Sequence, residues 1–193
     1  MQSKQSDFSH RQAKPNADEL FVQRWSPRAF SKQVIDPMAL ERIMQAARWS
    51  PSCFNDQPWR IYTSTEASFD AFLNLLVEGN QAWAKDTSVL GFVVAKLTFD
   101  HNDKPNAWAE FDCGAAWMSL SLQARMEGLY SHGMGGFHAE AAAEYLQLDQ
   151  SNHKVVMAFA LGHMAAADTL TAEQIEAEQP NQRKPLDEVW QQC

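Results

Sequence analysis

Arginine and serine side chains are concentrated in one short segment of an otherwise acidic chain. Arg24, Ser26 and Arg28 alternate along the sequence, although the chain carries a formal net charge of −8. Guanidinium groups match phosphate oxygens with paired hydrogen bonds, and a serine hydroxyl adds a neutral donor. Arg183 and Lys184 form a second basic pair near the C-terminus. Both segments are candidate anion sites, and both also fit ordinary salt-bridged surface arginines and lysines.

A second segment holds amide and hydroxyl side chains between two prolines. Ser52, Asn55 and Gln57 lie between Pro51 and Pro58, and proline stiffens the backbone at each end. Amide side chains both donate and accept hydrogen bonds, as the edge of a heterocyclic ring with carbonyls and an N–H requires. An ordinary helix-to-strand loop would use the same residues for turn bonds.

A third segment is rich in glycine. Gly133, Gly135 and Gly136 lie within four residues, and glycine permits close approach of the backbone to a flat ring. The spacing is not that of a dinucleotide-binding GxGxxG loop, so a simple turn is the alternative.

The remaining candidates for chemistry are weak. The histidines do not form an HxxxH or HExxH pair, so no metal site is expected. Cys53, Cys113 and Cys193 are odd in number and widely spaced, which argues against a disulfide framework and fits a reducing cytosol. Cys113 is expected in the core. The acidic surface disfavours nucleic acid and anionic membranes as partners. Without a signal-peptide pattern or a long apolar stretch, we expect a cytoplasmic protein.

The elements that must position these residues follow from the apolar periodicity. We expect helices over residues 18–24, 36–48, 68–77, 108–127 and 139–148, and strands over residues 60–63, 89–95 and 155–161. Asp36 and Ser68 are expected to cap their helices, with Gly79 just beyond the end of the third. In the helix over residues 108–127, we expect Phe111, Ala115, Met118 and Leu122 to form one apolar face of a central buried helix. Residues 129–137 are expected to be a loop or a strand leading into a loop.

The two ends of the chain differ from its middle. Residues 1–17 are polar and are expected to form a flexible or partner-held arm, followed by one domain over residues 18–193. Residues 165–185 contain too few apolar residues to build a core, so we expect them to lie over the body or over a second subunit.

Together, these segments resemble the nitroreductase family of FMN flavoproteins. The segment Arg24-Trp25-Ser26-Pro27-Arg28-Ala29-Phe30 is similar to its opening motif. The segment from Ala46 to Trp59 resembles its most specific stretch, AAxxAPSxxNxQPW. The Gly-Gly-Phe turn at 135–137 and the late Arg-Lys-Pro also have counterparts in the family.

The resemblance implies an α+β fold in which helices flank a mostly antiparallel central sheet. It also implies a homodimer whose C-terminal extension embraces the partner subunit. The FMN-binding residues that it implies are Arg24, Trp25 (through its backbone), Ser26, Arg28, Pro51, Ser52, Cys53, Asn55, Gln57, Gly135, Gly136, Arg183 and Lys184. The residues of the proline-flanked loop would line the flavin from the other subunit, and Gly135 and Gly136 would lie near its N5 atom. Some family members have an acidic residue where this chain has Gly135.

The implied activity is a ping-pong transfer of hydride from NADH or NADPH, through flavin N5, to a small electron-poor acceptor such as a nitroaromatic or a quinone. No catalytic acid–base residue is required for it. Trp83, Trp108 and Phe137 are candidate walls of the acceptor pocket. Two alternatives stay open: the same fold acting on an aldehyde, an enone or in a desaturation, and a flavin-binding protein without turnover.

Overall fold

The computed structural model describes residues 6–9, 11 and 17–193. Most of the arm expected over residues 1–17 therefore lies outside the described residues. The described part of the arm contacts the body of the protein. The hydroxyl of Ser6 lies 3.5 Å from Met164 Sδ, and Phe8 packs against one of the two hydrophobic cores.

The centre of the molecule is a five-stranded sheet, and every strand pair in the described chain is antiparallel. β3 pairs with β2 on one side and with β5 on the other. β4 pairs with the opposite edge of β5, so β5 lies between β3 and β4. β1 pairs with the end of β5. The strands are β1 (Phe30–Ser31), β2 (Trp59–Thr63), β3 (Val89–Lys96), β4 (Tyr130–Met134) and β5 (His153–Met164). The expected α+β class with a mostly antiparallel sheet is confirmed.

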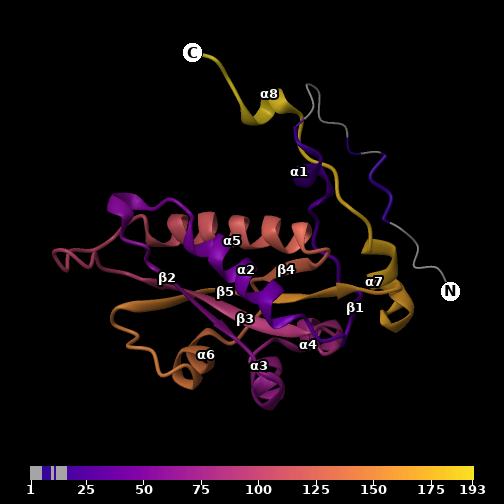
Figure 1. Ribbon diagram of the computed structural model, residues 1–193, viewed down its shortest axis with the longest axis horizontal. Helices are drawn as coiled ribbons and strands as arrows, with labels where there is room; N and C mark the ends of the chain where they lie inside the picture. Colours follow the sequence, from indigo (N-terminus) through magenta and orange to yellow (C-terminus); the bar gives the residue numbers. More distant parts are fainter. Residues whose placement is uncertain (1–5, 10, 12–16) are drawn as a thin grey trace.

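Helices cover both faces of this sheet. α2 and α5 lie on one face, and α3, α4 and α6 lie on the other (Figure 1). The helices are α1 (Glu19–Gln23), α2 (Pro37–Arg48), α3 (Phe69–Asn74), α4 (Glu78–Ala84), α5 (Ala109–Met126), α6 (Ala139–Tyr145), α7 (Ala172–Ala177) and α8 (Leu186–Val189). The sheet is thus the middle one of three layers.

β3 has no polar side chain from Val89 to Ala95 because both of its faces are buried. Leu90, Phe92 and Val94 belong to the core under α3, α4 and α6. Val89 and Val93 belong to the core under α2 and α5. Successive side chains of β3 point to opposite faces of the sheet, and each face is covered by an apolar core.

The prediction that Phe111, Ala115, Met118 and Leu122 form the buried apolar face of α5 is wrong. Phe111 is 73% exposed and Met118 is 36% exposed. The side chains that face the sheet and α2 are mostly small, such as Cys113, Ala116 and Ala124. Small side chains let a helix approach a sheet closely, and Phe111 and Met118 lie on the outer side of α5 instead.

The prediction of a single helix over residues 68–77 is also wrong. α3 ends at Asn74, and Gly79 lies inside a second helix, α4. The chain leaves the helical path because Leu76 bridges to Phe137 and because Val77 N donates to Gly136 O. Ser68 does not cap α3; its hydroxyl accepts a hydrogen bond from Thr65 N instead.

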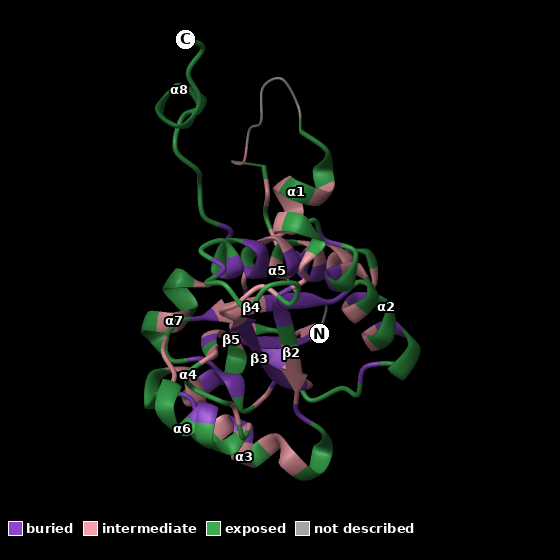
Figure 2. Ribbon diagram, turned by 90° about the vertical axis from the view of Figure 1, so that its left-hand side faces the viewer, coloured by how far each residue is buried: buried purple, intermediate pink, exposed green. Residues whose placement is uncertain are grey.

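The C-terminal extension first follows the body and then leaves it. α7 begins with a reciprocal capping box between Thr171 and Gln174, and Leu170 and Pro180 are buried. From Asn181 to Cys193 every residue is exposed. α8 and the C-terminus project away from the sheet and its helices (Figures 1 and 2).

Residues 25–30 are fixed to the body by buried aromatic side chains. Trp25 is 5% exposed and meets the ring of Tyr130 edge to face, with 6.4 Å between the centroids. His132 on β4 packs against Trp83 at 4.6 Å, and its Nδ1 lies 2.8 Å from Pro27 O. A carbonyl oxygen can only accept, so Nδ1 carries the proton in this bond.

Burial lowers the pKa of His132 to about 4. The positive charges of Arg28 and Arg24 also lower this pKa, whereas the hydrogen bond to Pro27 O raises it. A histidine in the unfolded chain has a pKa of about 6.5. Between these two values the unfolded chain binds more protons than the folded chain, so stability rises with pH there. The contribution of neutral His132 is present above about pH 6.5 and is lost as the pH falls toward 4.

The variant His132→Phe tests this linkage, because it keeps the contact with Trp83 and removes the titrating ring. We expect the wild type to be more stable at pH 7, since the variant leaves Pro27 O without its donor. That advantage should shrink steadily between pH 6.5 and pH 4, as measured by urea unfolding of both proteins. An advantage that is constant over this range would show that His132 does not titrate as described.

Two glycines give a matched test of the packing. A Cβ on Gly91 of β3 would lie 2.3 Å from the ring of Phe159 and 2.6 Å from Tyr62 O, whereas a Cβ on Gly79 of α4 would meet nothing within 4 Å. We expect Gly91→Ala to destabilise the protein by about 1–3 kcal/mol or more, because overpacking forces neighbours to shift. Gly79→Ala should stabilise it by about 0.5–1 kcal/mol, the usual helical preference for alanine. Equal effects in urea unfolding would contradict this packing.

Candidate functional site

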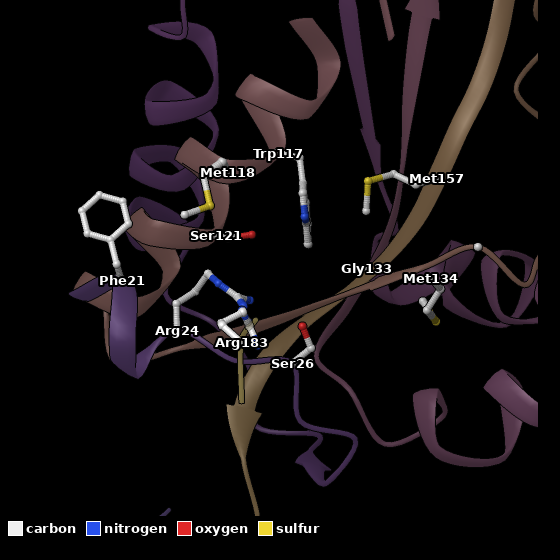
Figure 3. A pocket seen from close by; sticks show the side chains of 11 residues that line it. Phe21, Arg24, Ser26, Trp117, Met118, Ser121, Gly133, Met134, Met157 and Arg183 are labelled. Atoms are coloured by element: carbon white, nitrogen blue, oxygen red, sulfur yellow. The ribbon is translucent and has the colours of Figure 1, made fainter. Parts of the chain in front are cut away.

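A pocket of about 670 Å³ opens between the C-terminal end of α1, the middle of α5, strands β4 and β5, and the C-terminal extension. Its described lining combines two guanidiniums and two hydroxyls with apolar side chains and two glycines (Figure 3). The lining residues are Phe21, Arg24, Ser26, Trp117, Met118, Ser121, Gly133, Met134, Gly135, Met157 and Arg183. Four residues of the predicted site are among them: Arg24, Ser26, Gly135 and Arg183.

One end of the pocket is positively charged. Arg24 and Arg183 point toward each other there, and the hydroxyl of Ser26 lies nearby (Figure 3). Burial and the neighbouring guanidinium of Arg183 lower the pKa of Arg24. Like charges held this close repel each other. A bound anion would relieve that repulsion.

No carboxylate of the described residues forms an ion pair with Arg24 or Arg183. Arg183 donates weakly to the backbone carbonyls of Asn181 and Gln182, and no hydrogen bond from the Arg24 guanidinium to another described side chain is formed. In a chain of net charge −8, a half-buried Arg24 beside an exposed Arg183, with no acidic partner among the described residues, favours an anionic ligand.

The opposite end of the pocket is apolar and built around a glycine. Trp117 extends from α5 toward Met157 of β5, away from the two arginines (Figure 3). A Cβ on Gly133 would lie 2.5 Å from Met157 Cε and 3.2 Å from the Trp117 ring. Glycine at this position therefore allows both side chains to lie against β4. The resulting surface suits a flat apolar ring.

The two glycines expected near the ring differ in their surroundings. Gly135 is exposed, and a Cβ there would meet nothing within 4 Å. Gly136 contacts α4 instead: its carbonyl accepts from Asn80 Nδ2 at 2.9 Å, and a Cβ would lie 2.8 Å from both Asn80 Nδ2 and Val77 Cγ2. Packing against α4 is thus a sufficient reason for glycine at 136.

Arg28 lies beside a carboxylate from the C-terminal extension rather than among the lining residues. Glu178 Oε1 accepts hydrogen bonds from the backbone N–H groups of Arg28 and Ala29, at 2.7 and 2.8 Å. Its Oε2 lies 4.0 Å from Arg28 Nη1. These contacts join α7 to the segment that carries Arg24 and Ser26. Lys184 is exposed and pairs with Glu188 at 3.7 Å.

The proline-flanked loop forms a separate, rigid feature. It contains a 3₁₀ turn over Cys53–Asn55, in which Phe54 and Asn55 have positive φ angles, as does Gln57. Ser52 Oγ accepts from Gln57 N at 3.0 Å. The buried Asp112 of α5 accepts from Cys53 N at 3.1 Å.

In the single chain this loop does not line the pocket. It is attached at the first turn of α5, whereas the pocket uses Trp117, Met118 and Ser121 further along the helix. Pro51, Ser52, Cys53, Asn55 and Gln57 are therefore brought together with one another but not with Arg24 and Arg183.

The aromatic residues that line the pocket differ from the predicted ones. Trp83, which was expected as a pocket wall, is 2% exposed and lies in the core. Trp108 and Phe137 are not among the lining residues either. Trp117 and Phe21 line the pocket instead. No motif marks Trp117 or Met157, which become neighbours only because α5 packs over β4 and β5 beside Gly133.

Other candidate groups are inert or absent in the described chain. Cys113 is buried, and burial together with Asp112 raises the pKa of its thiol to about 12. No three histidine, cysteine, aspartate or glutamate side chains of the described residues gather as metal ligands would. None of the described helices is both long enough and apolar enough to cross a membrane.

Comparisons with known proteins identify the family. A model described as the nitroreductase family matches residues 21–82 and 65–163. The uncharacterized 15.4 kDa protein in the ask 5′ region of Mycolicibacterium smegmatis is 32% identical over 129 residues, covering 65% of this chain and 83% of that protein. Among solved structures, the chain is similar to an oxidoreductase containing FMN, with 39% identity, a TM-score of 0.88 and 93% of each chain covered.

A further solved structure shares the fold. It is a Staphylococcus epidermidis protein with the provisional name NAD(P)H:FMN oxidoreductase, with 18% identity, a TM-score of 0.74, and 97% of this chain and 96% of that chain covered. The matched ranges of the family model span most of the 193 residues. This chain belongs to the nitroreductase family.

Proposed function

We propose that this chain is an FMN-dependent oxidoreductase that takes electrons from NADH or NADPH and passes them to a small electron-poor acceptor. The observation that carries the proposal is the pocket itself, with two guanidiniums that form no ion pair with a described carboxylate at one end and a Trp–Met–Gly surface at the other. A ligand that fits both ends has a flat ring and a terminal anion. The similar oxidoreductase that contains FMN supports this choice.

The residues present fit FMN. Arg24, Arg183 and the hydroxyl of Ser26 would hold the phosphate, because guanidiniums and hydroxyls supply donors without a competing carboxylate. Trp25 would contribute backbone groups, and Arg28 and Lys184 lie on the same two segments. The exposed backbone at Gly135, and Gly136 beside it, would approach the ring from β4, on the side where Trp117 and Met157 lie.

When bound, FMN would supply the redox chemistry, the transfer of hydride from NADH or NADPH to a nitroaromatic or a quinone by a ping-pong mechanism. The chain's own residues bind and orient. No carboxylate and no histidine are among the described lining residues. The protein is therefore suited to hold a cofactor that carries the electrons, rather than to supply an acid–base pair.

We also propose that two copies of the chain form a homodimer. The outward face of α5 exposes Phe111, Met118 and Met126, at 73%, 36% and 65%, and Phe21 beside it is 51% exposed. An exposed apolar patch of large side chains is typical of an interface. Packing of a second copy against this face would let the loop that carries Pro51, Ser52, Cys53, Asn55 and Gln57 complete the partner's pocket.

The projecting C-terminal segment supports the same arrangement. Leu186, Val189 and Trp190 are each more than half exposed, at 54%, 65% and 56%. A short helix with apolar side chains gains nothing by projecting into water. We propose that α8 packs on the partner subunit.

The first test is retention of the cofactor. We expect the purified protein to show a flavin spectrum that NADH or NADPH bleaches without oxygen. Arg24→Ala should weaken FMN binding by about ten- to a hundredfold, the usual effect of losing a hydrogen bond to a charged group. Lys85→Ala, which removes an exposed charge on another face, is the control.

Three results would count against the proposed activity. Protein that is colourless and takes up no added FMN would refute the cofactor assignment. Full retention by Arg24→Ala would refute the phosphate assignment. Bound FMN that neither nicotinamide bleaches would indicate a flavin-binding protein without turnover.

The dimer is tested by placing a charge on the outward face of α5. We expect the wild type to elute as a dimer in gel filtration and Phe111→Asp to weaken association by roughly a hundredfold, as for a central apolar contact. Val34→Asp changes a residue that is 83% exposed but lies before α2, and it should leave the dimer intact. A wild type that is monomeric with FMN bound would contradict the proposal.

A further inference from the structure

The guanidinium of Arg11 joins two segments that are far apart in the sequence. Its Nη1 donates to Val22 O at 2.7 Å and to Arg24 O at 3.1 Å. Its Nε donates to Asn181 O at 2.8 Å, across a sequence separation of 170 residues. The rigid planar fork of arginine suits such a junction, because several donors are fixed in one plane.

The first of these segments needs an external anchor. α1 has five residues, and none of them is buried. Isolated helices below about 12 residues are marginal in water, and the last carbonyls of a helix have no partner within it. Arg11 occupies carbonyls at this end, so it fixes the backbone from which Arg24 enters the pocket.

The second segment needs an anchor for a different reason. Every residue from Asn181 onward is exposed, yet Arg183 lines the pocket. The carbonyl of Asn181, which Arg11 holds, also accepts from Arg183 Nη1 at 3.3 Å. The contact with Arg11 therefore ties the extension to the body two residues before Arg183.

Arg11 is itself fixed on the side of the N-terminal arm. Its backbone N–H donates to Phe8 O at 2.9 Å, and its guanidinium lies 5.8 Å from the centre of the Phe8 ring. Phe8 packs against the core. Burial and the charges of Arg183 and Arg24 lower the pKa of Arg11, so the three guanidiniums form one repelling cluster.

We propose that Arg11 is a positioning residue that latches α1 to the C-terminal extension and so holds Arg24 and Arg183 together for a terminal phosphate. The latch opposes the mutual repulsion of the cluster before the anion is bound. The inference rests on the proposed function for the identity of the anion.

The test compares two flavins that differ in the phosphate alone. Apoprotein is titrated with FMN and with riboflavin, and flavin fluorescence gives both dissociation constants. We expect Arg11→Ala to weaken FMN binding on the order of tenfold, as for one lost charged contact, and to leave riboflavin binding unchanged. Lys154→Ala removes a charge from the exposed pair with Glu110 and should change neither constant.

A conservative variant separates position from charge. Arg11→Lys keeps the charge but loses the planar fork, so we expect it to bind FMN as poorly as Arg11→Ala. Both variants should also be cleaved by trypsin after Arg183 faster than wild-type apoprotein, because the hydrogen bond that holds Asn181 is lost. This readout does not depend on flavin.

The outcomes are distinct. Wild-type affinity for FMN in Arg11→Ala, or full rescue by lysine, would overturn the latch while leaving the FMN assignment intact. Equal loss of riboflavin and FMN binding would also overturn it, because a general loss of structure would then explain the effect. A wild type that binds neither flavin would refute the proposed function instead.

Discussion

The central constraint on this structure is the repulsion between the half-buried guanidinium of Arg24 and the exposed guanidinium of Arg183, which no carboxylate of the described residues neutralises. Arg24 and Arg183 come from opposite ends of the chain, and burial together with their proximity lowers the pKa of Arg24. Such a pair stays together only if the surrounding backbone holds it. Trp25 in the core, Glu178 on the N–H groups of Arg28 and Ala29, and Arg11 on three carbonyls provide that support.

Helix α5 contacts the sheet, the pocket and the proline-flanked loop through different parts of its surface. Small residues bring it against the sheet, and Trp117 reaches the pocket. Asp112 in its first turn holds the proline-flanked loop through Cys53 N. Its outward face carries exposed Phe111 and Met126. In the homodimer that we propose, one helix would thus position parts of two sites.

Local patterns in the sequence predicted α2 with Asp36 as its cap and the buried strand β3, and the resemblance of its motifs to the nitroreductase family implied the α+β class. They also predicted Arg24, Ser26, Gly135 and Arg183, which the fold brings to one pocket. Local patterns could not reveal α4, because the break before it depends on hydrogen bonds from Val77 and Asn80 to Gly136. Gly136 follows Asn80 by 56 residues in the sequence, and only the fold brings the two together. They misplaced the inner face of α5, since side-chain size there reflects the closeness of the sheet. Trp117 and Arg11 carry no local signal, because their roles depend on contacts with β5 and with residue 181.

The most direct test of the account is a crystal structure of the protein grown with FMN, in which the distance from the phosphorus atom to each guanidinium carbon is measured. The account predicts that the phosphate lies in hydrogen-bonding contact with Arg24 and Arg183, with the ring extending toward Trp117 and Gly135. A phosphate bound elsewhere, with Arg24 and Arg183 left facing each other, would contradict it.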